Sequence, residues 1–392
     1  MKKIKILVTG TETLRGGTDT YLRPVFSHCH PTVYEFHRTA TKEALSTNSN
    51  DDGITKHVFP LTYSLVSLLP CAVELRRLIQ RERFDLLHLN TVRSGFLGCL
   101  AATGLPVAIV YTPHAWRFEQ KKTLLKPLWF AFDRYICSRA NMVTTISQRE
   151  KNIGLAKGLV TRDKVETIYA QLDMQELKNI DLAQMQVEKH CLGIPDNACV
   201  IGNTGTMESR KDPLTFVRTA AKIRATIPNA YFLWVGDGEL RAQASELAYQ
   251  SGIGDRLVIT GWRPRNQTLV LLHLMDVFLF TSRIEGVPLS ILEAQATRRP
   301  VVSSAFLGVE ELINHGRTGY VFSPGNEEEA SRCVLELLQD SNKTSEMVEA
   351  AERQVLERHG NPQRMAKQYE KIYEKALQLA GALSRYLFWK QA

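Results

Sequence analysis

Residues 277–304 have the sequence VFLFTSRIEGVPLSILEAQATRRPVVSS. Two short apolar runs of strand type, 277–282 and 300–304, flank a helical segment in which Pro288 can occupy the first position. Two successive strands connected through a helix run parallel to each other in one sheet. The stretch therefore predicts a βαβ unit, and with it a parallel sheet covered by helices.

The same alternation recurs along the chain, with strand-type runs at 3–9, 84–90, 107–114, 142–147, 199–205, 230–238 and 257–262. It weakens only at 170–195, where the sequence is polar and irregular. This pattern predicts two doubly wound α/β domains, with a linker near 170–195. Ligands of such domains bind beyond the carboxyl ends of the strands, so functional motifs are expected directly after strands.

The length and composition agree with two domains. A chain of 392 residues exceeds what one hydrophobic core normally supports. The net charge of +8 suits an anionic partner, which could be a nucleic acid, an anionic membrane surface or a phosphorylated substrate. No nucleic-acid-binding module is recognisable, so nucleic acid is disfavoured.

The chain is expected to be a cytosolic protein that is soluble or peripheral to a membrane. None of its seven cysteines forms a CxxC pair, which predicts reduced thiols without a zinc site or disulfide framework. The apolar run after Lys2 and Lys3 is too short for a secretion signal. The longest apolar stretch, 61–73, is too short to span a bilayer.

The loop after the first strand contains Gly10, Gly16 and Gly17, which do not fit the G-x-G-x-x-G spacing of dinucleotide-binding enzymes. A nicotinamide enzyme is therefore disfavoured. Gly16 and Gly17 precede a helix expected to begin near Thr18, where backbone N–H groups could meet an anion. A plain flexible turn is the alternative.

Two histidines belong to predicted strands of the first domain. His114 ends the strand 107–114 and should face the ligand-binding edge, which makes it a site candidate. A hydrogen-bonded structural role is the alternative for this residue. His88 lies within the strand 84–90, and we expect it to be buried and structural.

In the second domain, Arg210 and Lys211 stand just before a helix that Asp212 and Pro213 can open. Lys211 could pair with a phosphate, although exposed charge before a helix is also common. Further on, the acidic residues of the segment 235–241 are expected to cap a helix rather than bind a metal. No metal site is predicted, because no cluster has ligand spacing.

The opening stretch combines a helix start with two carboxylates. Leu289 and Ser290 offer free amide groups at a helix N-terminus, where a diphosphate is favoured. Glu293, one to two turns further, has two acceptor oxygens suited to vicinal hydroxyls such as those of a ribose. Glu285, before Gly286, could accept from a sugar hydroxyl. These features predict a nucleotide-sugar site.

The spacing of Glu285 and Glu293, with VGDGELR at 235–241 and EELINHGRTGYVFSPGN at 310–326, resembles retaining glycosyltransferases of the E-x7-E type. These belong to glycosyl transferases group 1, family 4, and many build bacterial surface polysaccharides. The resemblance implies a GT-B fold, in which two Rossmann-like domains face a central cleft. It implies an acceptor-side domain at 1–175, a donor-binding domain at 176–361, and a helical tail at 362–392 that packs back toward the first domain.

The resemblance also implies roles for individual residues. Lys211 would neutralise the diphosphate leaving group, His114 would approach the transferred sugar, and Trp262 and Arg263 would lie near the base. Catalytic roles are implied for His114, Lys211 and Glu285, and donor binding for Gly16, Gly17, Arg210, Lys211, Trp262, Arg263, Glu285, Gly286, Leu289, Ser290 and Glu293.

The sequence departs from the family pattern at three places. Thr206 stands where the family often has Arg, so a phosphate-binding cation is missing unless Arg210 substitutes for it. Leu307 precedes Gly308 where two glycines are usual, and Ala170 and Gln171 replace Asn-Gly. Activity is still expected, with an altered donor preference.

The resemblance implies transfer of a sugar from a nucleotide donor, UDP-linked by default, to a glycan or lipid-linked acceptor in capsule, O-antigen, exopolysaccharide or lipopolysaccharide synthesis. No cofactor is expected, and the reaction should be metal-independent. A nucleotide-sugar epimerase of the same fold and a non-catalytic nucleotide-sugar binding protein are the alternatives. The basic, aromatic segment 117–139 could lie on the anionic cytoplasmic face of a membrane, or pack its aromatic residues on the sheet.

Overall fold

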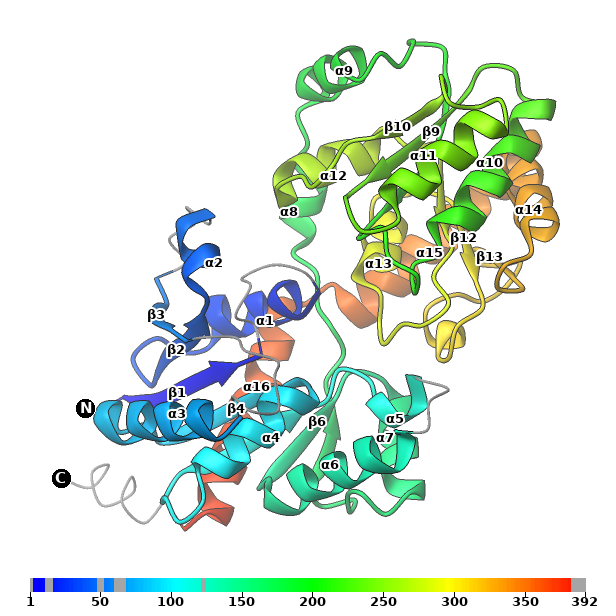
Figure 1. Cartoon of the computed structure of the whole chain (residues 1–392). Coiled ribbons are helices and arrows are strands. Elements are labelled where there is room, and N and C mark those ends of the chain that lie inside the picture. Colours follow the sequence, from blue (N-terminus) through cyan, green and yellow to red (C-terminus); the bar gives the residue numbers. More distant parts are fainter. Residues whose placement is uncertain (1–2, 11–16, 48–52, 60–67, 121–124, 382–392) are drawn as a thin grey trace. The chain divides into compact units, whose positions relative to one another are not determined.

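The computed structural model describes residues 3–10, 17–47, 53–59, 68–120 and 125–381 (Figure 1). The chain divides into two compact units. Unit 1 comprises Met1–Gln171 together with Asn361–Ala392, and unit 2 comprises Leu172–Gly360. Each unit is built around one parallel β-sheet.

The sheet of unit 1 has the strand order β3-β2-β1-β4-β5-β6-β7, and every neighbouring pair is parallel. The strands are β1 Ile4–Thr9, β2 Tyr34–Ala40, β3 Thr55–Val58, β4 Leu86–Asn90, β5 Ala108–Thr112, β6 Met142–Thr145 and β7 Val165–Thr167. The helices are α1 Gly17–His28, α2 Lys42–Thr47, α3 Leu68–Glu82, α4 Thr91–Ala101, α5 Arg117–Gln120, α6 Lys126–Arg139, α7 Gln148–Ala156 and α16 Pro362–Leu379. The central strands β4, β5 and β6 are buried along their whole length, as expected for a sheet covered on both faces.

The sheet of unit 2 has the order β10-β9-β8-β11-β12-β13, again with parallel neighbours. Its strands are β8 Cys199–Thr204, β9 Ala230–Val235, β10 Leu257–Ile259, β11 Val277–Phe280, β12 Val301–Ser304 and β13 Tyr320–Phe322. The helices are α8 Met174–Lys178, α9 Leu182–Cys191, α10 Pro213–Thr226, α11 Arg241–Gln250, α12 Arg265–His273, α13 Leu289–Ala296, η2 Val309–Glu311, α14 Glu327–Gln339 and α15 Ser341–His359. The prediction of two doubly wound parallel α/β sheets is confirmed.

The strand orders locate where each sheet can hold a ligand. In each unit the first strand lies between the second and the fourth: β1 between β2 and β4, and β8 between β9 and β11. The winding direction reverses at that point, and the loops on either side diverge to leave a crevice at the carboxyl ends of the strands. The loops after β1 and β4, and those after β8 and β11, are therefore the places to look for function.

The chain passes from unit 1 to unit 2 between Gln171 and Leu172, within the segment 170–195 predicted as a linker, but the prediction that this segment is irregular is wrong. This segment forms α8 and α9, and both belong to unit 2. Asp173 caps α8 by accepting from the amides of Gln175 and Glu176, and Asp181 caps α9 by accepting from the amide of Ala183. The caps supply partners for N–H groups that the first turn of a helix leaves free. A smaller correction concerns Pro288, which is the N-cap of α13 rather than its first residue.

The C-terminal helix α16 is part of unit 1, where it packs on α1 and β5. Asn361 caps it by accepting from the amide of Arg364 at 2.9 Å, and its own amide donates to Oε1 of Gln171 at 2.9 Å. Tyr369 and Tyr373 are fully buried on its inner face. The helix thus completes the core of a unit whose other elements all lie before residue 168.

Tyr369 and Tyr373 bring hydroxyl groups into this core, and both join a buried chain of hydrogen bonds. In order, the chain comprises Tyr373 Oη, His88 Nδ1 and Nε2, Thr112 Oγ1, Thr144 Oγ1, Tyr369 Oη, Tyr21 Oη and the carbonyl oxygen of Ile168, at 2.9, 2.9, 2.5, 3.4, 3.0 and 2.9 Å. Because the carbonyl can only accept, Tyr21 donates to it, and every preceding hydroxyl donates to the next. His88 then carries its proton on Nε2.

Burial lowers the pKa of His88 to about 3, so its ring is neutral at pH 7. The expectation of a buried, structural His88 agrees with its complete burial and its two ring partners.

Candidate functional site

The loop after β8 places Lys211 at the switch point of unit 2. Asp212 adopts a left-handed backbone with φ 49° and caps α10 by accepting from the amide of Thr215, and Pro213 is the first residue of that helix. The Lys211 carbonyl accepts a hydrogen bond from Oγ1 of Thr281 at 2.9 Å. The side chain of Lys211 passes over Gly205, where a Cβ would lie 3.6 Å from its Cε.

Lys211 and Glu285 form an ion pair across the switch point. Nζ of Lys211 lies 2.6 Å from Oε1 of Glu285, and Nη1 of Arg210 lies 3.7 Å from Oε2. The side chains of Lys211 and Glu285 are only 14% and 7% exposed. Nζ of Lys211 also lies 5.2 Å from the centroid of the Phe280 ring. The structure thus brings together three residues that the sequence assigned to the diphosphate and the sugar.

The two loops that carry this pair are bonded to each other. Arg283, after β11, donates from Nε to Oδ2 of Asp212 at 2.6 Å and from its amide to the carbonyl of Arg210 at 2.8 Å. Asp212 therefore stabilises two segments: its Oδ1 caps α10, and its Oδ2 accepts from Arg283 in the loop after β11. The position of Glu285 relative to Lys211 follows from this brace.

Thr206, at the position where the resemblance leads us to expect an arginine, bonds to a carboxylate instead of supplying a cation. Its Oγ1 donates to Oε1 of Glu208 at 2.7 Å, and Nε of Arg210 reaches the same oxygen at 2.7 Å. Burial works to raise the pKa of Glu208, but these bonds and the nearby cations lower it overall. The half-exposed guanidinium of Arg210 is therefore the cation that this loop offers beside Lys211.

The loop after β9 packs on the β8 loop, backbone against backbone. A Cβ on Gly236, whose φ is 150°, would lie 2.0 Å from the carbonyl oxygen of Gly205, and one on Gly238 would lie 2.5 Å from that of Met207. Both positions therefore require glycine. Asp237 accepts from the amide of Gly238 and from Nη1 of Arg241, each at 2.9 Å.

Among the residues that the structure describes, no group of three or more His, Cys, Asp or Glu side chains is arranged to hold a metal ion.

The helix α13 carries Glu293 on its buried face and begins with Leu289 and Ser290. No side chain caps its N-terminus, and Gly286 lies in the loop that leads into it. Glu293 is 7% exposed. Its Oε1 accepts from Nη1 of Arg265 at 2.7 Å. The residue predicted as a ribose ligand is thus paired with a cation that the sequence did not point to.

Arg265 is the first residue of α12 and binds a second carboxylate. Its Nε donates to both oxygens of Glu176, on α8, at 2.9 Å each. Burial alone would lower the pKa of Arg265, but the charges of Glu293 and Glu176 raise it above its usual value. The one feature of the sequence that could have indicated Arg265 is its place two positions after Arg263, which belongs to the loop predicted to lie near the base. No feature of the sequence indicated Glu176.

Trp262 and Arg263 occupy the loop between β10 and α12. The Trp262 residue is 53% exposed, and Nη1 of Arg263 lies 3.5 Å from Oε1 of Gln267. Gly261, just before them, forms an isolated bridge with Gly236 of the β9 loop. The loops after β8, β9 and β10 are therefore neighbours at one edge of the sheet.

In unit 1, His114 follows β5 and bonds to the residue that ends β4. Its Nε2 lies 2.8 Å from Oδ1 of Asn90, whose Nδ2 donates to the carbonyl of Thr9 at 3.1 Å. Asn90 Oδ1 is therefore the acceptor, and the neutral His114 carries its proton on Nε2, leaving the lone pair on Nδ1. Burial lowers the pKa of His114 to about 4, so the ring is neutral at pH 7.

The backbone at His114 is held in an unusual conformation by one buried carboxylate. His114 and Ala115 have φ values of 53° and 82°. Glu150 accepts from the amide of Ala115 at 2.5 Å and from that of Ile146 at 2.8 Å, and its carbonyl accepts from Nε1 of Trp116 at 2.8 Å. Such strain persists where the surroundings over-determine it, and it is common at functional sites.

The switch point of unit 1 lies beside His114. A Cβ on Gly10, after β1, would lie 2.1 Å from the carbonyl oxygen of Asn90. Gly17 is the exposed first residue of α1, and Gly16 lies outside the described residues. A buried ion pair fixes α1 on β2, with Nη1 of Arg38 2.7 Å from Oδ1 of Asp19.

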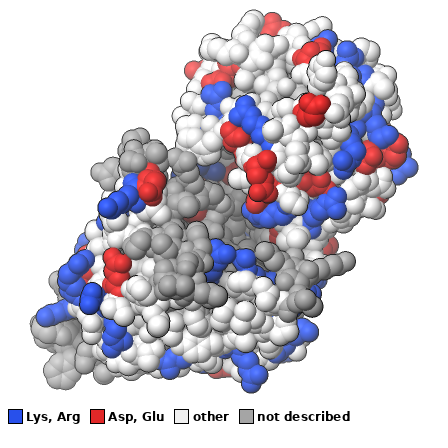
Figure 2. All heavy atoms as spheres, viewed as in Figure 1, with Lys and Arg blue, Asp and Glu red and all other residues white. Residues whose placement is uncertain are grey.

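The described part of the segment 117–139 packs its aromatic rings on unit 1. The guanidinium of Arg117 stacks on Trp129 at 4.4 Å, and Trp129, Phe130 and Phe132 contact the core cluster of the unit. Leu125 and Leu128 are exposed. On the face drawn in Figure 2, unit 1 carries mainly Lys and Arg, whereas unit 2 carries charges of both signs.

No helix in the described ranges is long and apolar enough to cross a bilayer.

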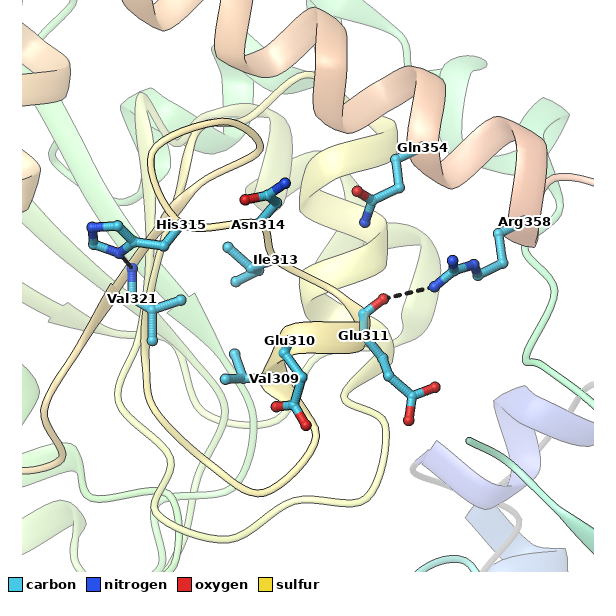
Figure 3. A pocket seen from close by; sticks show the side chains of 9 residues that line it. All are labelled: Val309, Glu310, Glu311, Ile313, Asn314, His315, Val321, Gln354 and Arg358. Atoms are coloured by element: carbon cyan, nitrogen blue, oxygen red, sulfur yellow. Dashed lines mark hydrogen bonds between the residues drawn. The ribbon is translucent and has the colours of Figure 1, made fainter. Parts of the chain in front are cut away.

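A separate hollow of about 450 Å³ in unit 2 lies between η2, the turn before β13, and α15 (Figure 3). Nη1 of Arg358 donates to the carbonyl of Glu311 at 3.0 Å at one side of it. None of the predicted site residues lines this hollow. Gly308 is the N-cap of η2 and has a φ of 98°, a left-handed conformation that favours glycine. Leu307, which precedes it, is exposed.

Both units match known families. Residues 27–176 match the model of Glycosyltransferase Family 4, and residues 185–354 match that of glycosyl transferases group 1. The chain is 28% identical over 281 residues to UDP-Gal:alpha-D-GlcNAc-diphosphoundecaprenol alpha-1,3-galactosyltransferase of Escherichia coli, covering 69% of this chain and 71% of that protein. It is 27% identical over 309 residues to N-acetyl-alpha-D-glucosaminyl L-malate synthase of Bacillus anthracis, covering 78% of each.

Among solved structures, HepE of Anabaena in complex with UDP and glucose has a TM-score of 0.78 to this chain. The two are 20% identical, and the match covers 94% of this chain and 98% of HepE. At this level of identity the likeness concerns the fold, which is the two-domain GT-B architecture.

Proposed function

We propose that this chain, a GT-B glycosyltransferase with a family 4 domain followed by a group 1 domain, transfers a sugar from a UDP-linked donor to a glycan or lipid-linked acceptor with retention of anomeric configuration. The observation that carries the proposal is the ion pair of Lys211 and Glu285 at the switch point of unit 2. It places a cation beside a hydrogen-bond acceptor at the point where a doubly wound sheet binds its ligand.

Lys211 would act on the leaving group. Cleavage of the bond between the sugar C1 and the diphosphate oxygen leaves additional negative charge on the diphosphate. A preorganised ammonium group, shielded from water, stabilises this charge in the transition state. The free amides of Leu289 and Ser290 at the start of α13 would add the positive end of a helix dipole. Glu285 would accept a hydrogen bond from a sugar hydroxyl.

Retention follows if the acceptor enters on the face from which the diphosphate leaves. The acceptor oxygen then forms its bond to C1 as the C1–phosphate oxygen bond breaks, and the departing diphosphate takes the acceptor proton. No carboxylate is required as the base in this step. His114, neutral at pH 7, would contact the transferred sugar by a hydrogen bond, not as a charged group.

The relatives support the substrate classes by their names. The Escherichia coli relative uses UDP-Gal and a diphosphoundecaprenol-linked sugar, and HepE was solved with UDP and glucose. We extend to this chain the use of a UDP-sugar and of a lipid-linked acceptor, in the assembly of a bacterial surface polysaccharide.

A lipid-linked acceptor would place the reaction at the cytoplasmic membrane surface. The exposed Leu125 and Leu128, next to Lys126, provide an apolar and basic edge on unit 1 that suits an anionic bilayer. Flotation with vesicles containing phosphatidylglycerol tests this idea. The full chain should float with anionic vesicles and less well after replacement of Leu125 and Leu128 by Ser. Absence from anionic vesicles would contradict it.

The reaction itself can be tested in two steps. A thermal-shift screen of UDP-, GDP- and ADP-sugars identifies the donor, and release of nucleoside diphosphate is then measured with and without a polyprenyl-diphosphate-linked sugar. The expected result is release that depends on acceptor, with an α-linked product from an α-linked donor by NMR. An epimerase would convert donor without acceptor, and a binding protein would shift in melting temperature without releasing nucleotide. Either outcome would refute the proposal.

A further inference from the structure

The three charged residues Glu176, Arg265 and Glu293 form a linked group in unit 2. They come from α8, α12 and α13, and their side chains are 37%, 18% and 9% exposed. One guanidinium bridges the two carboxylates: Nε faces both oxygens of Glu176, and Nη1 faces Oε1 of Glu293. The planar guanidinium is therefore held in one orientation by three hydrogen bonds.

The group is poorly explained as a device for stability alone. Removing ionised groups from water costs several kcal/mol each, and apolar replacement of a largely buried pair such as Arg265 and Glu293 is often neutral or stabilising. The charge pattern is informative, because two carboxylates and one guanidinium leave a net charge of −1. A site with surplus negative charge favours hydroxyl donors and repels phosphate oxygens.

Glu293 has one carboxylate oxygen that the group does not use. Oε1 accepts from Arg265, while Oε2 makes no hydrogen bond or ion pair with any side chain in the described part of the chain. A carboxylate fixed at one oxygen keeps the other in a defined place, at little further entropic cost on binding. Arg265 directly follows the loop that holds Trp262 and Arg263, so the group adjoins the loop expected near the base.

We propose that Arg265 is a positioning residue of the donor site: it orients the Glu293 carboxylate so that Oε2 receives the ribose hydroxyls, and Glu176 in turn orients Arg265. The inference rests on the proposed function, in which the donor is a nucleotide sugar. It adds two residues, Arg265 and Glu176, to the recognition of the ribose.

The experiment compares binding of UDP and 2′,3′-dideoxy-UDP by calorimetry, for the full-length wild type and its variants. A hydrogen bond to a charged group contributes about 1.5–3 kcal/mol, so the wild type should bind UDP roughly 10- to 100-fold more tightly than the dideoxy form. Arg265→Lys should weaken UDP binding about tenfold and leave dideoxy-UDP binding nearly unchanged. Glu176→Gln should show the same selective loss, at smaller size.

Two further variants separate positioning from folding. Arg265→Lys combined with Glu293→Gln should bind UDP no more weakly than Glu293→Gln alone, because Arg265 acts through Glu293. Arg298→Lys, which changes a half-exposed arginine paired with Glu349 in the same unit, should leave both affinities unchanged.

The outcomes distinguish this inference from the proposal on which it rests. If Arg265→Lys weakens the binding of both ligands equally, or of neither, Arg265 is only a structural clamp and the inference is wrong. In that case a wild type that still binds UDP more tightly than dideoxy-UDP leaves the proposed ribose role of Glu293 intact. If the wild type binds both ligands equally, Glu293 does not hold the ribose, and the donor-site assignment fails together with the inference.

Discussion

Nζ of Lys211 lies 2.6 Å from Oε1 of Glu285, and the two side chains are among the least exposed charged groups at the switch point of unit 2. Each partner is thereby the main counter-ion of the other, with Arg210 further away at 3.7 Å. A change at either position will alter both the charge available to a ligand and the stability of the unit. The two effects have to be measured separately.

Replacing Lys211 by Ala should lower the transfer rate on the order of 10²–10³-fold, because the transition state loses a preorganised cation. The unit should also be destabilised, because Glu285 keeps a nearly buried charge without its close partner. Initial rates at saturating donor and the melting temperature measure the two effects. Normal turnover by this variant would show that Lys211 does not act on the leaving group.

Lys211→Ala combined with Glu285→Gln serves as the control for the first prediction. It removes the charge left behind, so the melting temperature should recover in part. The rate should not recover, since the cation is still absent and the Glu285 carboxylate, proposed to accept from a sugar hydroxyl, is lost as well. Recovery of both would mean that the single substitution acted through folding alone.

The reaction should proceed in EDTA at an undiminished rate, because Lys211, Arg210 and the amides at the start of α13 supply the positive charge that the diphosphate needs. The measurement is release of nucleoside diphosphate by enzyme dialysed against EDTA, with and without added Mg²⁺ or Mn²⁺. Loss of activity that either ion restores would contradict this prediction.

Gly236→Ala should destabilise unit 2 by on the order of 3 kcal/mol or more, because the new Cβ would meet the Gly205 carbonyl oxygen at 2.0 Å and the residue has φ 150°. Gly193→Ala is the matched control, since Gly193 also has a positive φ, 66°, but open space around its Cβ position. It should cost only about 1–2 kcal/mol. Urea unfolding of the two variants measures the difference, and equal losses would refute the packing argument.

The contributions of His88 and His114 to stability should fall as the pH is lowered below about 6.5, and the buried Asp133, whose pKa burial raises to about 7, works in the opposite direction. Burial lowers the folded-state pKa of His88 to about 3 and of His114 to about 4, so between these values and 6.5 the unfolded chain binds more protons at these two histidines than the folded one. His114→Asn should flatten this dependence in part, and asparagine tolerates the left-handed backbone of the position. Melting temperatures between pH 7.5 and pH 5 measure the slope. An unchanged slope in the variant would show that His114 titrates normally.

Tyr369→Phe should destabilise unit 1 by about 1–3 kcal/mol, because it interrupts the buried chain of hydrogen bonds between Thr144 and Tyr21. Tyr249→Phe, at a residue that is 78% exposed, is the control and should have no measurable effect. Thermal unfolding followed by circular dichroism compares them. A neutral Tyr369→Phe would mean that the hydroxyl contributes no net stability in this core.

The contact between Lys211 and Glu285 is the kind of relationship that a sequence can predict. Both residues follow strands, and a doubly wound sheet places its first and fourth strands side by side, so their loops must meet. The alternation of apolar runs with helical periods was sufficient to establish those strands. Asp212 and Pro213 likewise predict the start of α10, because Asp is a favoured N-cap residue and Pro is favoured at the first helical position.

The pairing of Arg265 with Glu293 could not be predicted in this way. It depends on how α12 and α13 pack, and Glu176 joins it from 89 positions away. Side-chain contacts between helices leave no periodic trace in a sequence. The helices α8 and α9 within the segment 170–195 could not be predicted for another reason: the apolar spacing there is weak, although Asp173 and Asp181 are potential caps.

The helix α16 has a consequence for how the protein is made. Most of unit 1 precedes unit 2 in the sequence, yet its core includes Tyr369 and Tyr373, which are translated after all of unit 2. A nascent chain emerging from the ribosome can therefore finish unit 2 while unit 1 still exposes the surface that α16 will cover. Unit 1 therefore becomes complete only after unit 2, and until α16 is added the apolar surface that this helix covers stays exposed.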